Sequence, residues 1–171
     1  MPKLTNKAIF EALDAVAERT GIPAYAAGKA KRRHLRWLPI VALVIATIGM
    51  AIMFAFAGWR ERALGQGMVF FGLMLAILLP MFGPVKLWGS GERVDEFDRD
   101  VRRNAFLVTF ATVSATAICG IWLILGLALL GNWDRSALLQ ILSAFTWYLM
   151  TLYSAVPTLH ASWATRPIGE D

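Results

Sequence analysis

The sequence predicts an all-α integral membrane protein with four transmembrane helices. Three observations support this: four long stretches without Asp, Glu, Lys or Arg, a hydrophobic content of 57%, and an uneven distribution of Lys and Arg. Each uncharged stretch is longer than the roughly 20 apolar residues that a helix needs to cross a bilayer. We expect one transmembrane domain over residues 37–165. Its predicted spans cover about 37–59, 66–86, 104–131 and 136–160.

A polar arm, residues 1–36, precedes the first span. Over residues 4–20 the apolar side chains fall on one helical face and the acidic ones lie elsewhere, with Gly21 and Pro23 following as helix terminators. This pattern predicts a short cytoplasmic amphipathic helix. Leu13 lies on its apolar face, which makes it a candidate for docking onto a partner or onto the bundle.

The end of the arm is basic. Lys31, Arg32, Arg33 and Arg36 stand directly before the first span. Cations at this position anchor the topology of a membrane protein and attract anionic lipid headgroups. We therefore expect the lipid bilayer itself as one partner, with these four side chains at its headgroups.

The second span is interrupted near its end by Pro80, Gly83 and Pro84. A proline inside a helix removes one backbone hydrogen bond and clashes with the carbonyl group four residues earlier. We expect a kink or an early end near residue 80. Two interpretations stay open: a simple kink, or a break whose freed backbone groups contribute to a binding site.

The middle loop, residues 86–103, is rich in charge. Val94, Phe97 and Val101 share one helical face, and two acid–base pairs stand four residues apart with the acid first, which stabilises a helix. We predict a charged cytoplasmic helix that runs directly into the third span and offers these three residues for docking. Salt bridging explains its carboxylates without a metal or acid–base site.

Small and hydroxyl residues recur at helical spacing in the last two spans. Such residues let membrane helices approach closely and form hydrogen bonds between them. One interpretation is a packing or partner seam, and the other is a hydroxyl-lined path for a small solute. The candidate residues are Thr109, Thr112, Thr116 and Gly120 in the third span, and Ser143, Thr151 and Ser154 in the fourth.

An internal repeat connects the two halves of the domain. At a constant offset of 74 residues, identical residues align around the two predicted outer turns. The repeat predicts two parallel hairpins related by a pseudo-twofold axis along the membrane normal. The aligned pairs are Trp59 with Trp133, Ala63 with Ala137, Leu64 with Leu138, Gln66 with Gln140, and Phe71 with Phe145.

The basic residues predict the orientation. Fourteen of the seventeen Lys and Arg residues lie in the arm, the middle loop and the tail at 166–171, and three lie near the other two turns. Because positively charged loops stay in the cytoplasm, both termini are expected there, in a multi-pass plasma membrane protein of bacterial cytoplasmic-membrane type. The net charge of +5 is then a topology signal and implies no nucleic-acid partner.

The residues that membrane enzymes, proton pumps and redox proteins use are absent from the predicted spans. The four uncharged stretches contain one cysteine, Cys119, while His34 and His160 lie near the inner boundary. We therefore predict no catalytic residue, no metal ligand and no cofactor. The leading hypothesis is a non-enzymatic accessory, assembly or scaffold subunit that binds a membrane-protein partner or a second copy. The alternative is a small carrier or channel for a neutral or lipid-like solute.

Overall fold

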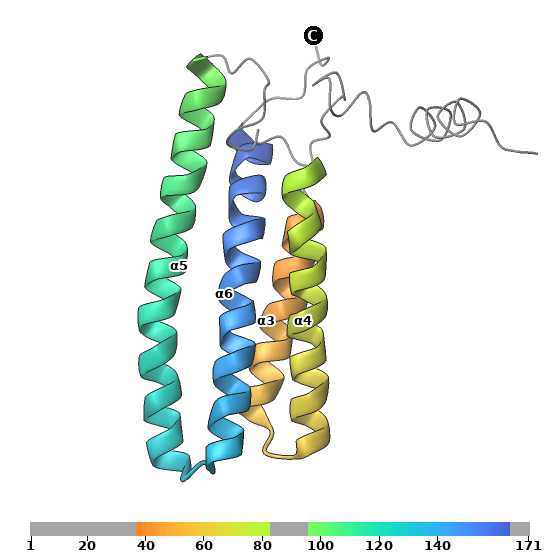
Figure 1. Cartoon of the computed structure of the whole chain (residues 1–171), viewed down its shortest axis with the longest axis vertical. Coiled ribbons are helices and arrows are strands. Elements are labelled where there is room, and N and C mark those ends of the chain that lie inside the picture. The colour runs from red at the N-terminus through yellow and green to blue at the C-terminus, as the bar shows by residue number, and fades with distance from the viewer. Residues whose placement is uncertain (1–36, 83–95, 165–171) are drawn as a thin grey trace, which may run out of the picture. The chain divides into compact units, whose positions relative to one another are not determined.

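The computed structural model describes residues 37–82 and 96–164, which form four α-helices and two short turns. The helices are α3 (Trp37–Ala55), α4 (Trp59–Phe82), α5 (Glu96–Gly131) and α6 (Arg135–Ala164), drawn in Figure 1. The predicted amphipathic arm, the basic cluster before α3 and the tail lie outside the described residues. The all-helical class is confirmed.

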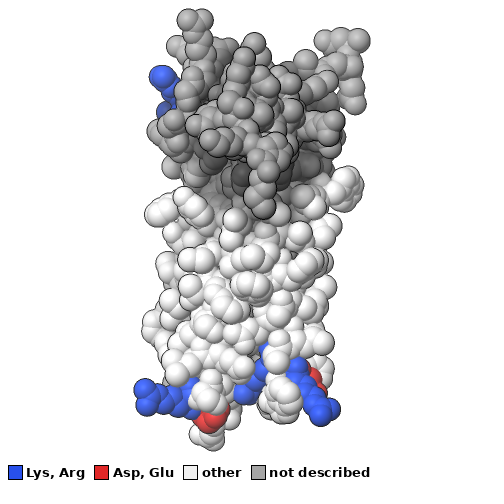
Figure 2. All heavy atoms as spheres, turned by 45° about the vertical axis from the view of Figure 1, so that its right-hand side comes forward, with Lys and Arg blue, Asp and Glu red and all other residues white. Residues whose placement is uncertain are grey.

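All four helices are long and apolar enough to cross a membrane, as in a multi-pass membrane protein. Their side chains explain this property, because the charges of the described residues lie at the two ends of the helices. Figure 2 shows the result on one face: a white surface without Lys, Arg, Asp or Glu separates the charged side chains at the lower end from those further up.

α5 is the longest helix, with 36 residues. It begins at Glu96 inside the predicted charged loop and continues without interruption to Gly131, which confirms the predicted helix that runs into the third span. At 1.5 Å per residue it is about 54 Å long, well beyond the roughly 30 Å of a bilayer's hydrocarbon core.

Both limits of α4 differ from those of the predicted span, 66–86. It begins at Trp59 rather than near residue 66, because Arg60, Glu61 and Arg62 form its first turns. At its other end the helix passes through Pro80 and ends at Phe82. Pro80 therefore lies in the last turn of α4, whose end at Phe82 is close to the early end expected near residue 80.

Two tight turns close the same end of the bundle, which we call the turn end; the opposite end is the far end. Between α3 and α4, the carbonyl oxygen of Gly58 accepts the N–H of Arg62 at 3.1 Å. Between α5 and α6, Asn132 has a φ of 46°, and the N–H of Trp133 reaches back to the carbonyl oxygen of Ala128 at 3.3 Å. This is the left-handed helix ending that Asn tolerates better than most residues.

α6 is the central helix of the bundle. Its backbone packs against α3, α4 and α5, and α3 also packs against α4, whereas α5 comes close to α6 alone among these helices. In Figure 1, α5 stands at the outer side of α6, away from the α3–α4 pair. Only 6% of the apolar window of α5 is buried, against 33% to 39% for the other three helices. The described bundle is therefore a compact trio with one peripheral helix.

The residue pairs of the predicted repeat differ in burial. Phe71 is 55% exposed whereas Phe145 is 6% exposed, and Ala63 is exposed whereas Ala137 is buried. Gln66 and Gln140 form a further aligned pair, discussed below. The hairpin duplication stays a prediction.

Candidate functional site

The closest helix packing in the bundle joins α3 to α4 through glycine. A Cβ atom built on Gly65 would lie 2.6 Å from Cγ of Met53 and 2.7 Å from the carbonyl oxygen of Gly49. A Cβ atom on Gly72 would lie 2.9 Å from the carbonyl oxygen of Ala42. Small residues thus bring the two backbones together, as expected where lipid provides no hydrophobic reason for helices to associate. The α3–α4 pair forms the surface on which α6 packs.

Two clusters of buried side chains join α6 to the α3–α4 pair. The first joins Met50 and Met53 of α3 and Val69 of α4 to Ile141 and Phe145 of α6, and Ile124 of α5 also belongs to it. The second lies nearer the far end and is built on small side chains. Its members are Ala42 of α3, Ala76 and Leu79 of α4, and Ala155 of α6.

Two polar contacts cross between helices. Nε2 of Gln140 on α6 donates to Oε1 of Gln66 on α4 at 3.4 Å. The hydroxyl groups of Thr47 on α3 and Tyr148 on α6 are 3.1 Å apart. Because the Thr47 hydroxyl donates its single hydrogen to the carbonyl oxygen of Leu43, Tyr148 is the donor in the second contact. Both contacts fix α6 against the α3–α4 pair.

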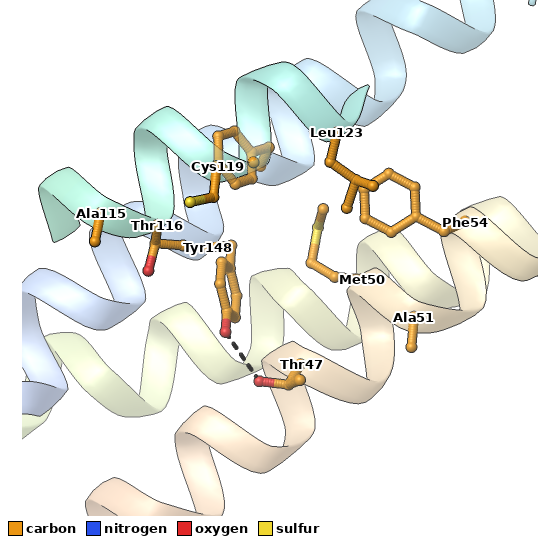
Figure 3. Close-up of a pocket in the computed structure, with 11 residues that line it drawn as sticks. Thr47, Met50, Ala51, Phe54, Ala115, Thr116, Cys119, Leu123 and Tyr148 are labelled. Carbon is orange, nitrogen blue, oxygen red and sulfur yellow. Dashed lines mark hydrogen bonds between the residues drawn. The ribbon is translucent and has the colours of Figure 1, made fainter. Parts of the chain in front are cut away.

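A hollow of about 540 Å³ lies between α3 and α5, with α6 as its floor. Figure 3 shows α5 on one side, with Thr116, Cys119 and Leu123, and α3 on the other. Side chains of Phe54 and Leu123 project into the space between the two helices. The lining is largely apolar, and its hydroxyl pair Thr47–Tyr148 is internally bonded. We call it the middle hollow.

A second hollow of about 600 Å³ follows along the same side of the bundle, closer to the far end. Ile40 of α3 and Val108 of α5 form its walls, and α6 contributes His160 and Trp163 among others. The Nδ1 atom of His160 is buried and has no hydrogen-bond partner. We call this the far hollow. The two hollows together form the α3–α5 groove, which runs beside α6.

Ser162, two residues after His160, has a buried hydroxyl group without a hydrogen-bond partner. Ser162 is fully buried, and its Oγ atom makes no hydrogen bond. It does not line the far hollow. His160 and Ser162 are not hydrogen-bonded to each other. The pair therefore lacks the contact through which a base activates a hydroxyl nucleophile.

The predicted seam residues separate into three groups. Thr109 and Thr151 are buried, and their hydroxyl groups donate to the carbonyl oxygens of Ala105 and Trp147 in their own helices. Thr116 and Gly120 line the middle hollow, and a Cβ atom on Gly120 would collide with the ring of Phe145. The remaining three are half-buried: Thr112, Ser143 and Ser154.

The hydrogen bonds of this set differ from the expected ones. Thr112 donates to the carbonyl oxygen of Val108, and Ser143 donates to that of Gln140, each within one helix. Hydroxyl groups that bond to the preceding turn satisfy themselves locally. The small residues of this set therefore contribute by size, while Thr47, Tyr148 and the two glutamines form hydrogen bonds between helices.

The predicted docking and headgroup residues lie mostly outside the described residues. Leu13 and Val94 are outside them, as are the headgroup residues Lys31, Arg32, Arg33 and Arg36. Phe97 falls in the first turn of α5, and nothing is described of its side chain. Val101 is half-buried on α5.

Sequence reasoning missed the residues that build the groove from the α3 side. Thr47, Met50 and Phe54 were not singled out, and neither was Tyr148 on α6. The steps 47, 50, 54 follow the helical spacing of three and four, which marks them as one face. The sequence does not distinguish this face from a lipid-facing one, because the residues opposite it depend on the position and rotation of α5.

The turn end carries an acidic helix cap. Oδ2 of Asp134 accepts a hydrogen bond from the hydroxyl group of Ser136 at 2.6 Å, and Oδ1 accepts the backbone N–H of Ala137 at 3.1 Å. These two bonds, in that order of size, lower the pKa of the Asp134 carboxyl group, and the positive charge of Arg62 acts in the same direction. The cap begins α6 and connects its start electrostatically to α4.

Comparison with known proteins yields no relative of the chain. What the protein does is therefore inferred from its own residues. No protein-family model, no curated protein and no solved structure matches it.

Proposed function

We propose that the protein is a non-enzymatic accessory or scaffold subunit that binds another membrane protein along α5. The observation that carries this proposal is the peripheral position of α5, which packs on α6 alone among the described helices. A transmembrane helix that gains so little from its own bundle has most of its surface available to a partner.

The exposed side chains of α5 support a protein partner over lipid alone. Ala111, Ile118 and Trp122 are all exposed and stand seven and four residues apart on one face, which we call the outer stripe. A small residue at midspan lets a second helix approach closely, and a neighbouring aromatic ring adds contact area. The outer stripe thus combines the features of a helix-packing surface without a helix on it.

The membrane position and orientation belong to the same proposal. We infer a multi-pass protein of a bacterial cytoplasmic membrane, with both termini in the cytoplasm and the turn end outside. The support is the excess of Lys and Arg in the arm, the middle loop and the tail. The proposed absence of catalysis is supported by the spans, which hold no charged side chain.

Co-purification tests the accessory role. The tagged full-length protein is extracted from its own membranes in a gentle detergent and identified with its companions by mass spectrometry. A stoichiometric membrane protein is expected with the parent chain and is expected to be lost from Ala111→Trp, which places a large ring on the outer stripe. Ile48→Trp on the exposed face of α3 is the matched control and should retain the partner.

Two outcomes contradict the binding of a partner along α5. One is recovery of the parent chain as a lone monomer. The other is a partner that is retained equally by Ala111→Trp and Ile48→Trp, because this would exclude the outer stripe as the binding surface.

A second candidate function is a carrier for a neutral or lipid-like solute. The specific observation that favours it is the α3–α5 groove, whose two hollows follow one another beside α6. A carrier should lose transport when the groove is filled, whereas an accessory subunit should lose its partner when the outer stripe is changed.

A further inference from the structure

We propose that the α3–α5 groove holds one acyl chain of a phospholipid, with the lipid's phosphate group hydrogen-bonded by His160 at the far end. This inference rests on the membrane-spanning arrangement that underlies the proposed function, but not on the accessory role.

The lining of the middle hollow favours hydrocarbon. Met50, Phe54 and Leu123 contribute apolar surface from both walls, and Phe145 contributes more from the floor. The polar groups of Thr47 and Tyr148 satisfy each other, as the dashed line in Figure 3 shows. These two groups therefore offer little to a polar solute, which would lose its bonds to water, and Thr116 supplies the one further hydroxyl group of a lining that is otherwise largely apolar.

The length of the groove matches a single leaflet. From Tyr148 in the middle hollow to His160 in the far hollow, α6 advances twelve residues, or about 18 Å at 1.5 Å per residue. Half of a 30 Å hydrocarbon core is about 15 Å. A chain anchored at the far end would therefore end near the middle hollow.

The far end supplies the partner for a phosphate group. The side chain of His160 lines the far hollow, and its Nδ1 atom is buried without a hydrogen-bond partner. An N–H group of an imidazole ring donates well to a phosphate oxygen. The first turns of α5 add exposed Arg99 and Arg103 at the same end, with Asp100 as an acid between them. This excess of positive charge complements a phosphate and would repel a cationic head.

Photocrosslinking tests the proposal on the full-length protein in phosphatidylcholine nanodiscs. The probes are phosphatidylglycerol and diacylglycerol that carry the same diazirine-labelled acyl chain. Peptide mapping should place most of the phosphatidylglycerol label on groove residues of α3 and α5, with several-fold weaker labelling by diacylglycerol. His160→Leu should remove this preference for the phospholipid while the tail label stays in the groove.

Groove-filling variants separate a bound lipid from the surrounding bilayer. Thr116→Trp should lower groove labelling at least five-fold, and Thr116→Leu serves the same purpose should the larger variant fail to fold. Ile118→Trp, two residues away but on the outer stripe, should leave groove labelling unchanged. The helix content of each variant is checked by circular dichroism.

Three results would overturn the proposal. The label could spread evenly over the exposed faces of all four helices, as for unspecific bilayer lipid. Groove labelling could be the same in Thr116→Leu as in the parent chain. A second protein, rather than lipid, could be crosslinked in the groove. Loss of the co-purified partner in Ala111→Trp with groove labelling intact would instead concern the accessory role alone.

Discussion

The α3–α4 pair and the α5–α6 pair are both antiparallel hairpins of long apolar helices, yet they are held together differently. In the first pair, Gly49, Gly65 and Gly72 bring one backbone against the other. In the second pair, the ring of Phe145 lies against Gly120, and only 6% of the apolar window of α5 is buried. Similar composition thus gives one hairpin that acts as a core and one whose first helix acts as a surface.

The difference shows what small residues do in a lipid-like setting. They stabilise a contact only where the opposite helix also offers backbone, since dispersion attraction falls off steeply with distance. α5 has more small residues than α4, but Gly126, for example, faces no helix, since nothing lies within 4 Å of a Cβ atom built on it. Its small residues are therefore available for binding.

Replacing a glycine at the close contact of the first hairpin should have the largest effect on stability. Gly65→Ala is expected to cost about 2 kcal/mol of unfolding free energy, because the new methyl group would overlap the backbone of α3. Gly67→Ala is the matched control, since nothing lies within 4 Å of its Cβ position. Reversible denaturation in mixed detergent micelles measures both. Equal stability of the two variants would contradict the close packing of α3 on α4.

The equivalent change in the second hairpin should have a smaller effect. Gly120→Ala is expected to cost about 1 kcal/mol, because its neighbour is the end of the Phe145 ring, which can turn aside. Gly126→Ala should be neutral or slightly stabilising, as alanine favours helix more than glycine does. The same denaturation assay applies. A larger loss for Gly120→Ala than for Gly65→Ala would reverse the comparison of the two hairpins.

The bond between α3 and α6 should be weaker still. In a double-mutant cycle of Thr47→Val and Tyr148→Phe, we expect a coupling energy of about 0.6 kcal/mol, the average for hydrogen bonds between membrane helices. Thr146→Val is a suitable control, because its hydroxyl group bonds to Leu142 in its own helix. Additive effects of Thr47→Val and Tyr148→Phe would show that their bond stabilises nothing.

The helix cap at the turn end should have the smallest effect and a pH dependence. The pKa of Asp134 is lowered in the folded protein, so its contribution is present above the unfolded value of about 3.9 and is lost as the pH falls through the lower folded pKa. Thermal unfolding between pH 6 and pH 2.5 should show a decline in the acid range that Asp134→Ala reduces. Identical pH profiles of the two proteins would refute this cap.

The fold was largely predictable because it depends on where charges are absent. Uncharged stretches and the acid–base spacing before Arg103 predict four helices and the early start of α5, both of which the structure contains. The start of α4 was placed too late, since Arg60 and Arg62 were read as part of a loop although their side chains simply extend from its first turns. The expected early end near Pro80 agrees with the end of α4 at Phe82.

The candidate site was predictable only in part. Thr116 and Gly120 were identified by their spacing and do line the middle hollow. The hydroxyl groups of Thr109 and Thr151 instead donate hydrogen bonds to carbonyl oxygens of their own helices. The spacing of Gly65, Gly72 and Ala76 was visible in the sequence, whereas the hydroxyl residues of later spans attracted the prediction. The groove itself depends on the rotation and distance of α5, which no local pattern encodes.

The turn between α5 and α6 makes α5 a lever. It fixes one end of the helix, and the ring of Trp133 in this turn stacks on Phe54 of α3 with centroids 6.4 Å apart. The rest of the helix is held by α6 alone among its described neighbours. A tilt of about 5° around the turn would therefore carry the opposite tip, about 54 Å away, through about 5 Å. A small displacement beside Trp133 would therefore become a larger one at the far end of the bundle.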